Sequence, residues 1–168
     1  MTSSSLLVEI QQASSQASLC PSEADFTLWC NLSLQEAAKA QLASQALEVT
    51  LRLVDETESQ ELNLAYRGKN SPTNVLAFPY EADDFLPSEA HWPLLGELVI
   101  CVPQVRKEAQ EQAKPLASHF AHLTVHGMLH LQGYDHLTEA EASQMEALEI
   151  QLLAQLGIAN PYISQVLN

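Results

Sequence analysis

Alternation and short apolar runs predict four strands along the chain. Residues 47–53 alternate Leu and Val with Glu, Thr and Arg, which is the period of a half-buried strand. Three further segments rich in Leu, Val and Ile have the composition of buried strands, namely residues 6–10, 75–78 and 95–102. Pro79 ends the third strand, since proline cannot donate to a strand ladder.

Apolar side chains at helical spacing fill most of the segments between these strands. The expected helices are residues 22–45, 55–66, 103–113, 115–131 and 138–157. Ser33, three residues before Glu36, predicts a capping box and a break in the first helix. Thr138 and Glu141 predict a capping box at the start of the last helix, and Gly157 predicts its end.

Strands and helices are interspersed, with no repeat and no linker that divides the chain. The fold class is therefore α/β or α+β: a small sheet of about four strands with packed helices, and the histidine-bearing helix 115–131 at the centre. The length of 168 residues suits one domain, so we expect residues 1–168 to form a single domain. Residues 79–94 contain three prolines and four acidic residues and predict a long surface loop, either a functional lid or a passive acidic loop.

The cysteines and the apolar runs indicate the cellular compartment of the protein. Cys20, Cys30 and Cys101 are odd in number and form no C-x-x-C pair, so they indicate neither a disulfide framework nor a thiolate zinc site. No apolar run approaches the ~18 residues of a membrane span, and no basic segment followed by an apolar core begins the chain. We expect a cytoplasmic protein with no membrane partner.

The charge balance restricts how the protein could bind nucleic acid. The net charge is −14, with only seven Lys plus Arg. General electrostatic binding of nucleic acid depends on many Lys and Arg contacts to phosphate, so the composition argues against it. Arg67 and Lys69 nevertheless stand together in the polar segment 67–74, and a bound cation would add positive charge. A locally cationic cleft in an acidic protein is consistent with this distribution.

Residues 126–136, with the sequence HGMLHLQGYDH, carry the clearest chemical signal. His126 and His130 are four residues apart, so on a helix they share one face with Cβ atoms roughly 5–6 Å apart. Gly133 can adopt the positive φ that stops a helix, which lets the chain turn back and bring His136 to the same ion. Three neutral histidines leave a tetrahedral Zn²⁺ one open position for a water, the pattern of catalytic zinc.

Two further histidines lie on the same helical stripe but are not predicted ligands. His119 is seven residues from His126, roughly 10 Å along the helix axis, too far to join the same ion without a bend. His122 is either a core residue or a partner of a ligand imidazole. Imidazole also binds Ni, Cu and Fe, so Zn²⁺ is an inference from ligand type and number.

The same spacing raises the alternative of a metalloprotease. It matches the metzincin pattern H-E-x-x-H-x-x-G-x-x-H at every position except one. Metzincins have a glutamate after the first histidine as general base, whereas this chain has Gly127, which cannot accept a proton. We therefore expect no peptidase activity.

Three blocks of sequence occur in a characteristic order. They are LNLAYRGK with PTNVL (residues 62–69 and 72–76), LGELVI (95–100) and the histidine segment (126–136). Together they resemble the YbeY family of zinc-dependent endoribonucleases, also called rRNA maturation factors, over roughly residues 47–157. The resemblance implies a small α/β fold with one Zn²⁺ per chain on His126, His130 and His136. It also implies cleavage of single-stranded RNA in rRNA 3′-end maturation and ribosome quality control.

The resemblance extends to single residues. Arg67 looks like the family's arginine needed for activity, and its planar, permanently charged fork would stabilise charge on a phosphate in the transition state. Lys69 is a weaker candidate for binding the RNA backbone, and Asp135 is either an orienting partner of a ligand imidazole or a turn residue. Ala77, where serine is frequent, and Glu97, where aspartate is usual, depart from the family pattern and receive no role.

Two alternatives accompany this interpretation. The nucleophile is either a zinc-bound water or the RNA 2′-hydroxyl. A different class of function is a non-catalytic ribosome-binding factor, in which the zinc only braces the fold. Whether the protein is a nuclease or a binding factor, rRNA and ribosomal particles are the implied partners, and DNA is not expected.

Overall fold

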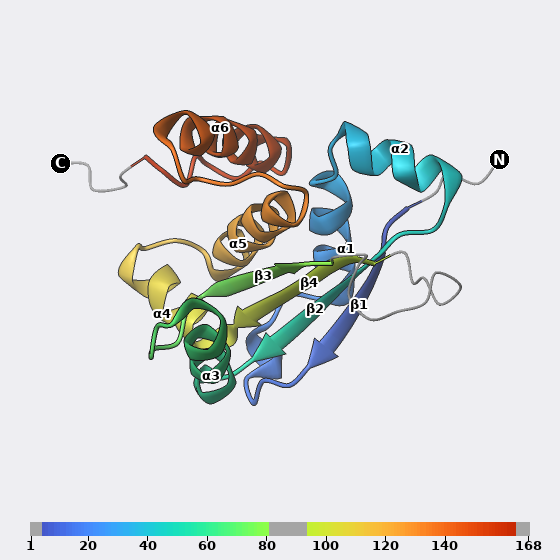
Figure 1. The fold of residues 1–168 in the computed structure, drawn as a ribbon. Helices are drawn as coiled ribbons and strands as arrows, with labels where there is room; N and C mark the ends of the chain where they lie inside the picture. The colour runs from blue at the N-terminus through green and yellow to red at the C-terminus, as the bar shows by residue number, and fades with distance from the viewer. Residues whose placement is uncertain (1–4, 81–93, 164–168) are drawn as a thin grey trace.

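A four-stranded mixed sheet runs through the part of the chain that the computed structural model describes, residues 5–80 and 94–163 (Figure 1). The strands are β1 (Leu7–Gln12), β2 (Glu48–Val54), β3 (Val75–Pro79) and β4 (Leu94–Cys101). The helices are α1 (Glu23–Leu32), α2 (Glu36–Ser44), α3 (Glu56–Arg67), α4 (Val102–Glu111), α5 (Leu116–Leu131) and α6 (Glu139–Gln155), with a 3-10 turn at Ala17–Leu19. The predicted fold class is confirmed.

The strand order in the sheet is β1-β2-β4-β3. β1, β2 and β4 are parallel, with Ile10 beside Leu51 and Leu51 beside Leu98, whereas β3 runs antiparallel to β4. β4 therefore lies between β2 and β3, although it follows β3 in the sequence. As a result, β3 is an edge strand, and no strand among the described residues pairs with its other side.

Helices cover both faces of this sheet. In Figure 1, α1 and α5 lie on one face, α3 lies on the other, and α6 lies on the side of α5 that faces away from the sheet. Alternate side chains of β2 and β4 are buried against α1 and α5: Val49, Leu51, Leu53, Leu98 and Ile100. Leu62 of α3 packs against a smaller cluster on the opposite face, made of Val54, Leu76, Val99 and Cys101. Fully burying one such side chain stabilises the fold by about 1.5–3 kcal/mol.

Gly127 is a point of close approach between α5 and the sheet. A Cβ atom added there would lie 2.7 Å from Cδ2 of Leu98 and 3.4 Å from Cγ2 of Val75. Only a residue without a side chain lets the helix lie this near to β3 and β4. The glycine thus places its helical neighbour His126 beside the edge strand.

The break between α1 and α2 occurs where it was expected, but its capping chemistry was predicted wrongly. Ser33 has αR backbone angles and ends α1, and its hydroxyl donates to the Trp29 carbonyl at 2.8 Å. An N-cap residue needs extended backbone, and Gln35 takes that position for α2. The capping box in this region is instead formed by Ser22 and Asp25 at the start of α1.

The other boundaries agree closely with the sequence pattern. Thr138 and Glu141 form the predicted capping box of α6, and Gly157 follows that helix with a φ of +76°. All three cysteines are free. Residues 81–93 of the expected loop 79–94 lie outside the described residues. No helix in the described parts of the chain combines the length and apolar character of a membrane span.

Candidate metal centre

The end of α5 and the turn after it bring His126, His130 and His136 together. The ring centroids of His126 and His130, one helical turn apart, are 4.7 Å from each other. Gly133 has a φ of +101°, and after it Tyr134 donates its backbone N–H back to the Leu129 carbonyl at 3.1 Å. This closed helix end reverses the chain, so the ring of His136 lies 5.1 Å from that of His130 and 5.9 Å from that of His126.

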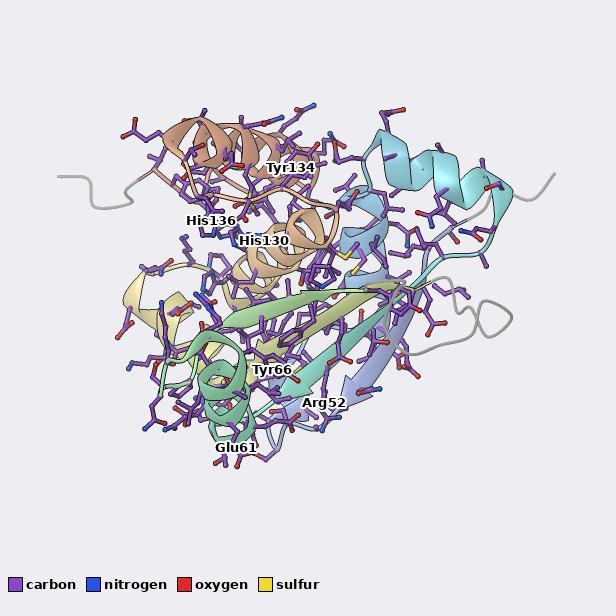
Figure 2. The ribbon with its side chains drawn as sticks, viewed as in Figure 1. Arg52, Glu61, Tyr66, His130, Tyr134 and His136 are labelled. Carbon is purple, nitrogen blue, oxygen red and sulfur yellow. The ribbon has the colours of Figure 1, made fainter. Side chains whose placement is uncertain are left out.

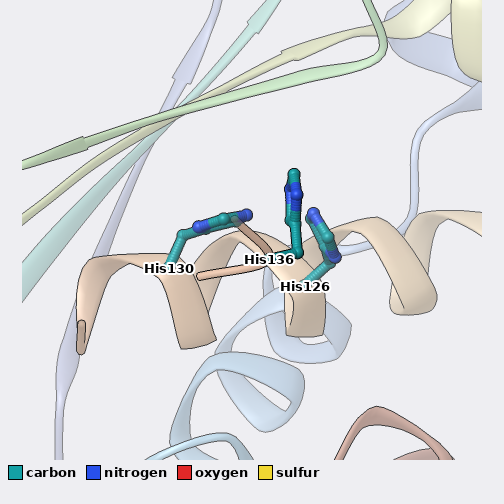
Figure 3. Close-up of side chains that lie close together, drawn as sticks. All are labelled: His126, His130 and His136. Atoms are coloured by element: carbon teal, nitrogen blue, oxygen red, sulfur yellow. The ribbon is translucent and has the colours of Figure 1, made fainter. Parts of the chain in front are cut away.

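The donor set fits one metal ion. One ring nitrogen from each histidine lies within 4.8 Å of the other two, and the rings gather on the side of α5 that faces β3 (Figure 3). Nitrogens that share a tetrahedral Zn²⁺ at about 2.0–2.1 Å are about 3.3 Å apart, so small side-chain rotations suffice. Burial, reinforced by the neighbouring His126 and His136, lowers the pKa of His130 and favours the neutral imidazole that a metal requires.

A buried carboxylate from α6 holds one of these imidazoles. Glu149 is 0% exposed, and its Oε2 lies 2.8 Å from Nδ1 of His126. Its Oε1 lies 2.8 Å from Nε2 of His122 and also accepts a hydrogen bond from the hydroxyl of Tyr162. A carboxylate without solvent is stable only when it is hydrogen-bonded in this way.

The Glu149 contact determines which nitrogen of His126 is left free to bind a metal ion. Burial alone raises the pKa of Glu149, but the hydrogen bonds from His122, His126 and Tyr162 outweigh it and lower the pKa to about 2. An ionised carboxylate only accepts hydrogen bonds, so Nδ1 of His126 carries the hydrogen. Nε2 therefore keeps its lone pair for a metal ion.

Sequence reasoning did not identify Glu149. The signal was present, because this glutamate lies among the inward-facing positions of the last helix, beside Met145, Leu152 and Leu153. A charged residue in such an apolar stripe needs a buried partner. Only the spatial arrangement shows that the partner is an imidazole of the three-histidine group.

We expect a Glu149→Gln variant to bind Zn²⁺ about 10- to 100-fold more weakly than the wild type, because the amide no longer enforces the Nδ1–H form of His126. The measurement is competition for Zn²⁺ against a chromophoric chelator, with circular dichroism to check the fold. Tyr162→Phe is the matched control, since it removes a bond to the same carboxylate but leaves the His126 contact. Equal affinities for Glu149→Gln and wild type would contradict this assignment.

A cleft of about 810 Å³ opens in front of the three histidines. Its walls include Tyr66 and Arg67 from the end of α3, all five residues of β3, and the turn 133–136. In the view of Figure 2, Tyr66 lies on the α3 side of edge strand β3, and His130 and His136 lie on the other. The cleft therefore wraps around the open edge of the sheet. Of the described residues that line it, Asp135 supplies the one carboxylate.

Two buried polar side chains of α3 hold the loop that follows Arg67. The amide of Asn63 donates to the Ser71 carbonyl at 2.8 Å. The hydroxyl of Ser59 donates to the Thr73 carbonyl at 3.0 Å and accepts from the Thr73 N–H at 2.9 Å. These bonds fix the end of α3 against β3 and so keep Arg67 in the cleft wall. Lys69 is exposed and does not line the cleft.

The remaining candidate residues lie in different places. Asp135 accepts a hydrogen bond from the backbone N–H of His136 at 2.8 Å, which shapes the turn. Buried His119 pairs with Glu108, with 2.9 Å between Nε2 and Oε1, and is outside the three-histidine group. His122 contacts Glu149 and through it is linked to the centre.

The two positions that depart from the family pattern lie on opposite faces of the sheet. Ala77 lines the cleft. Glu97 lies between inward-facing Gly96 and Leu98 and so points to the other face, where burial raises the pKa of its carboxyl and the nearby Arg52 opposes that effect. Glu97 therefore faces away from the histidines.

The packing at Gly127 also explains why no general base follows the first histidine. A glutamate there would have to displace the fully buried Leu98, whose Cδ2 lies 2.7 Å from the position of a Cβ atom. The position that carries the catalytic glutamate in metzincins is thus used here for contact between helix and sheet.

Two comparisons with known proteins name one family, and a third shows the fold. The family model described as Endoribonuclease YbeY matches residues 9–157. A protein of Alteromonas mediterranea named Endoribonuclease YbeY is 50% identical over 160 residues, which cover 93% of this chain and 96% of that relative. A Thermotoga maritima protein with a known solution structure has the same fold, with a TM-score of 0.51 at 22% identity over 90% of this chain and 92% of that one. The chain belongs to the YbeY family.

Proposed function

We propose that this chain is a single-domain, metal-dependent endoribonuclease that cleaves single-stranded RNA at the three-histidine centre. The observation that carries the proposal is the convergence of three histidine nitrogens within 4.8 Å of one another, on a cleft that Arg67 also lines. The name of the Alteromonas mediterranea relative, at 50% identity, supports the same activity.

His126, His130 and His136 would hold one Zn²⁺, and the ion would supply Lewis-acid activation of a phosphoryl oxygen. Arg67 binds the phosphate with its planar guanidinium and stabilises the charge that develops on the phosphate oxygens. Glu149 orients the His126 ring. Lys69, beyond the cleft wall, would contact the RNA backbone further along the strand. The role of each of these residues is part of the proposal.

The biological setting that we propose is rRNA 3′-end maturation and ribosome quality control in the cytoplasm, with rRNA and ribosomal particles as partners. The cleft supports a single strand as substrate, because its wall combines one guanidinium with aromatic and neutral polar side chains. Such a surface suits unpaired bases with few phosphate contacts, whereas an extended basic face suits a duplex.

The test combines metal analysis with RNA cleavage. Purified protein is expected to contain about one Zn²⁺ per chain, to cut a single-stranded RNA oligomer, to lose that activity with a chelator and to regain it with added Zn²⁺. Casein should stay intact throughout, because Gly127 supplies no general base. Metal-loaded protein that leaves RNA intact but still binds ribosomes would refute the nuclease and favour a binding factor. A substrate with a 2′-deoxy sugar at the cut site distinguishes attack by water from attack by the 2′-hydroxyl.

A further inference from the structure

Tyr66 is an aromatic residue that the fold leaves open to solvent. Its side chain is 68% exposed, although it stands in the last turn of α3, next to Arg67. Its ring meets the ring of Phe78 edge to face, with centroids 5.0 Å apart and planes at 64°. The ring of Tyr66 is therefore held in place by Phe78 but is not part of the hydrophobic core. Core packing does not account for an aromatic side chain at this position.

The neighbours of Tyr66 are held by packing and by a backbone hydrogen bond. Phe78 belongs to edge strand β3 and packs against the cluster of Val54, Leu76, Val99 and Cys101. The last turn of α3 is in turn closed by Gly68, which has a φ of +71° and donates its N–H to the Leu64 carbonyl at 3.1 Å. Tyr66 is therefore a preorganised surface, and little conformational entropy is lost when a flat group binds to it.

The position of Tyr66 points to its ligand. The ring lines the same cleft as the three histidines and is the chain neighbour of Arg67, the residue proposed to bind phosphate. In a nucleotide one sugar joins a flat aromatic base to a phosphate. A protein site that binds the base therefore lies next to the site that binds the phosphate. A neighbouring aromatic ring and guanidinium match this arrangement.

We propose that Tyr66 is a stacking platform for an unpaired nucleobase next to the phosphate that Arg67 binds. The inference rests on the proposed function, which it extends to how the substrate is held. Stacking uses the π face that every base presents, so it tolerates any sequence. It also requires a base that is free of its duplex neighbours, which selects single strands.

This platform helps an acidic protein bind RNA. With a net charge of −14 the chain cannot rely on many phosphate contacts. Stacking needs no net charge on the protein, so binding through Tyr66 is compatible with that surface. It adds affinity in a cleft where, among the described lining residues, Arg67 supplies the one guanidinium.

The test measures binding of a single-stranded 2′-O-methyl RNA oligomer to the zinc-loaded protein by fluorescence anisotropy. Tyr66→Ala should weaken binding about 5- to 150-fold, the range for loss of one stacked base. Tyr66→Phe should stay within about twofold of wild type, because the π face remains. Leu64→Ala is the matched control, since Leu64 is 49% exposed on the same helix but does not line the cleft.

A second measurement identifies the base. Oligomers with the base removed at one position at a time are bound by wild type and by Tyr66→Ala. At one position base removal should weaken wild-type binding while adding no loss to Tyr66→Ala, because the two changes remove the same contact. The stacking proposal would be overturned if Tyr66→Ala bound the oligomer as tightly as wild type. It would also be overturned if base removal weakened binding by Tyr66→Ala at every position as much as it weakens binding by wild type. Neither result would contradict the proposed nuclease activity. Wild-type protein that neither binds nor cuts single-stranded RNA would overturn the proposed function, and the platform with it.

Discussion

Replacing His130 by alanine is expected to abolish both metal binding and RNA cleavage. The side chain supplies one of three nitrogens, and two ligands do not hold Zn²⁺ in a tetrahedral site. Loss of a residue that only hydrogen-bonds a metal ligand weakens metal binding by about 10- to 100-fold. Loss of a ligand itself should cost more, so the affinity for Zn²⁺ should fall by more than about a hundredfold. The readouts are bound Zn²⁺ after dialysis and the initial rate of cleavage of a single-stranded RNA oligomer.

The His130→Ala protein should still fold without metal. His130 is half-buried, and alanine is the best helix former at a position inside α5. Far-ultraviolet circular dichroism checks this. His119→Asn is the control on the same helix: it removes an imidazole that pairs with Glu108, so it lowers stability but should leave the zinc content unchanged. A His130→Ala protein that keeps stoichiometric zinc would show that the ion is bound elsewhere.

Replacing Arg67 by alanine should reduce kcat/KM for RNA cleavage by about a hundredfold to a thousandfold, the usual effect of deleting one group that stabilises transition-state charge. Zinc content and melting temperature should stay at wild-type values. Arg67 lies in the cleft wall, outside the three-histidine group, and its side chain is exposed. The expected signature is therefore a folded, metal-loaded and inactive protein.

Arg67→Lys tests whether the charge alone is enough. Lysine keeps the charge but presents a point donor in place of a planar fork, so we expect partial recovery only. Lys69→Ala is the matched control, because Lys69 is a cation two residues away that does not line the cleft. Its substitution should affect cleavage far less. An Arg67→Ala enzyme with undiminished kcat/KM would remove the role proposed for this residue.

The elements of the fold were readable from the sequence because each depends on local chemistry. The alternation in β2, the capping box at Thr138 and the glycine after α6 act within a few residues. The strand order did not follow, because the pairing of β4 between β2 and β3 depends on contacts far apart in the chain. The capping box predicted at Ser33 was wrong because Ser33 keeps helical backbone angles at the end of α1. Those angles are not visible in the sequence.

The candidate site also has a part that local sequence predicts and a part that only the tertiary structure shows. His126, His130 and His136 lie within eleven residues, so helical spacing and one glycine predict that their rings converge, and the structure brings them together. Their role as metal ligands stays a prediction. Glu149 and Tyr66 come from other helices, and the sequence gives no spacing that relates either one to the histidines. Their relation to the histidines required the packing of α6 on α5 and of α3 against β3.

The bond between Glu149 and His126 joins the last helix to the ion-binding group. Ion capture and docking of α6 are then reciprocal: each strengthens the other by the same factor. A mutation that loosens α6 far from the histidines would raise the zinc concentration needed to load the protein, and depletion of zinc would make α6 easier to detach. With Zn²⁺ bound as proposed, the C-terminal helix would therefore be held most firmly when the ion is in place.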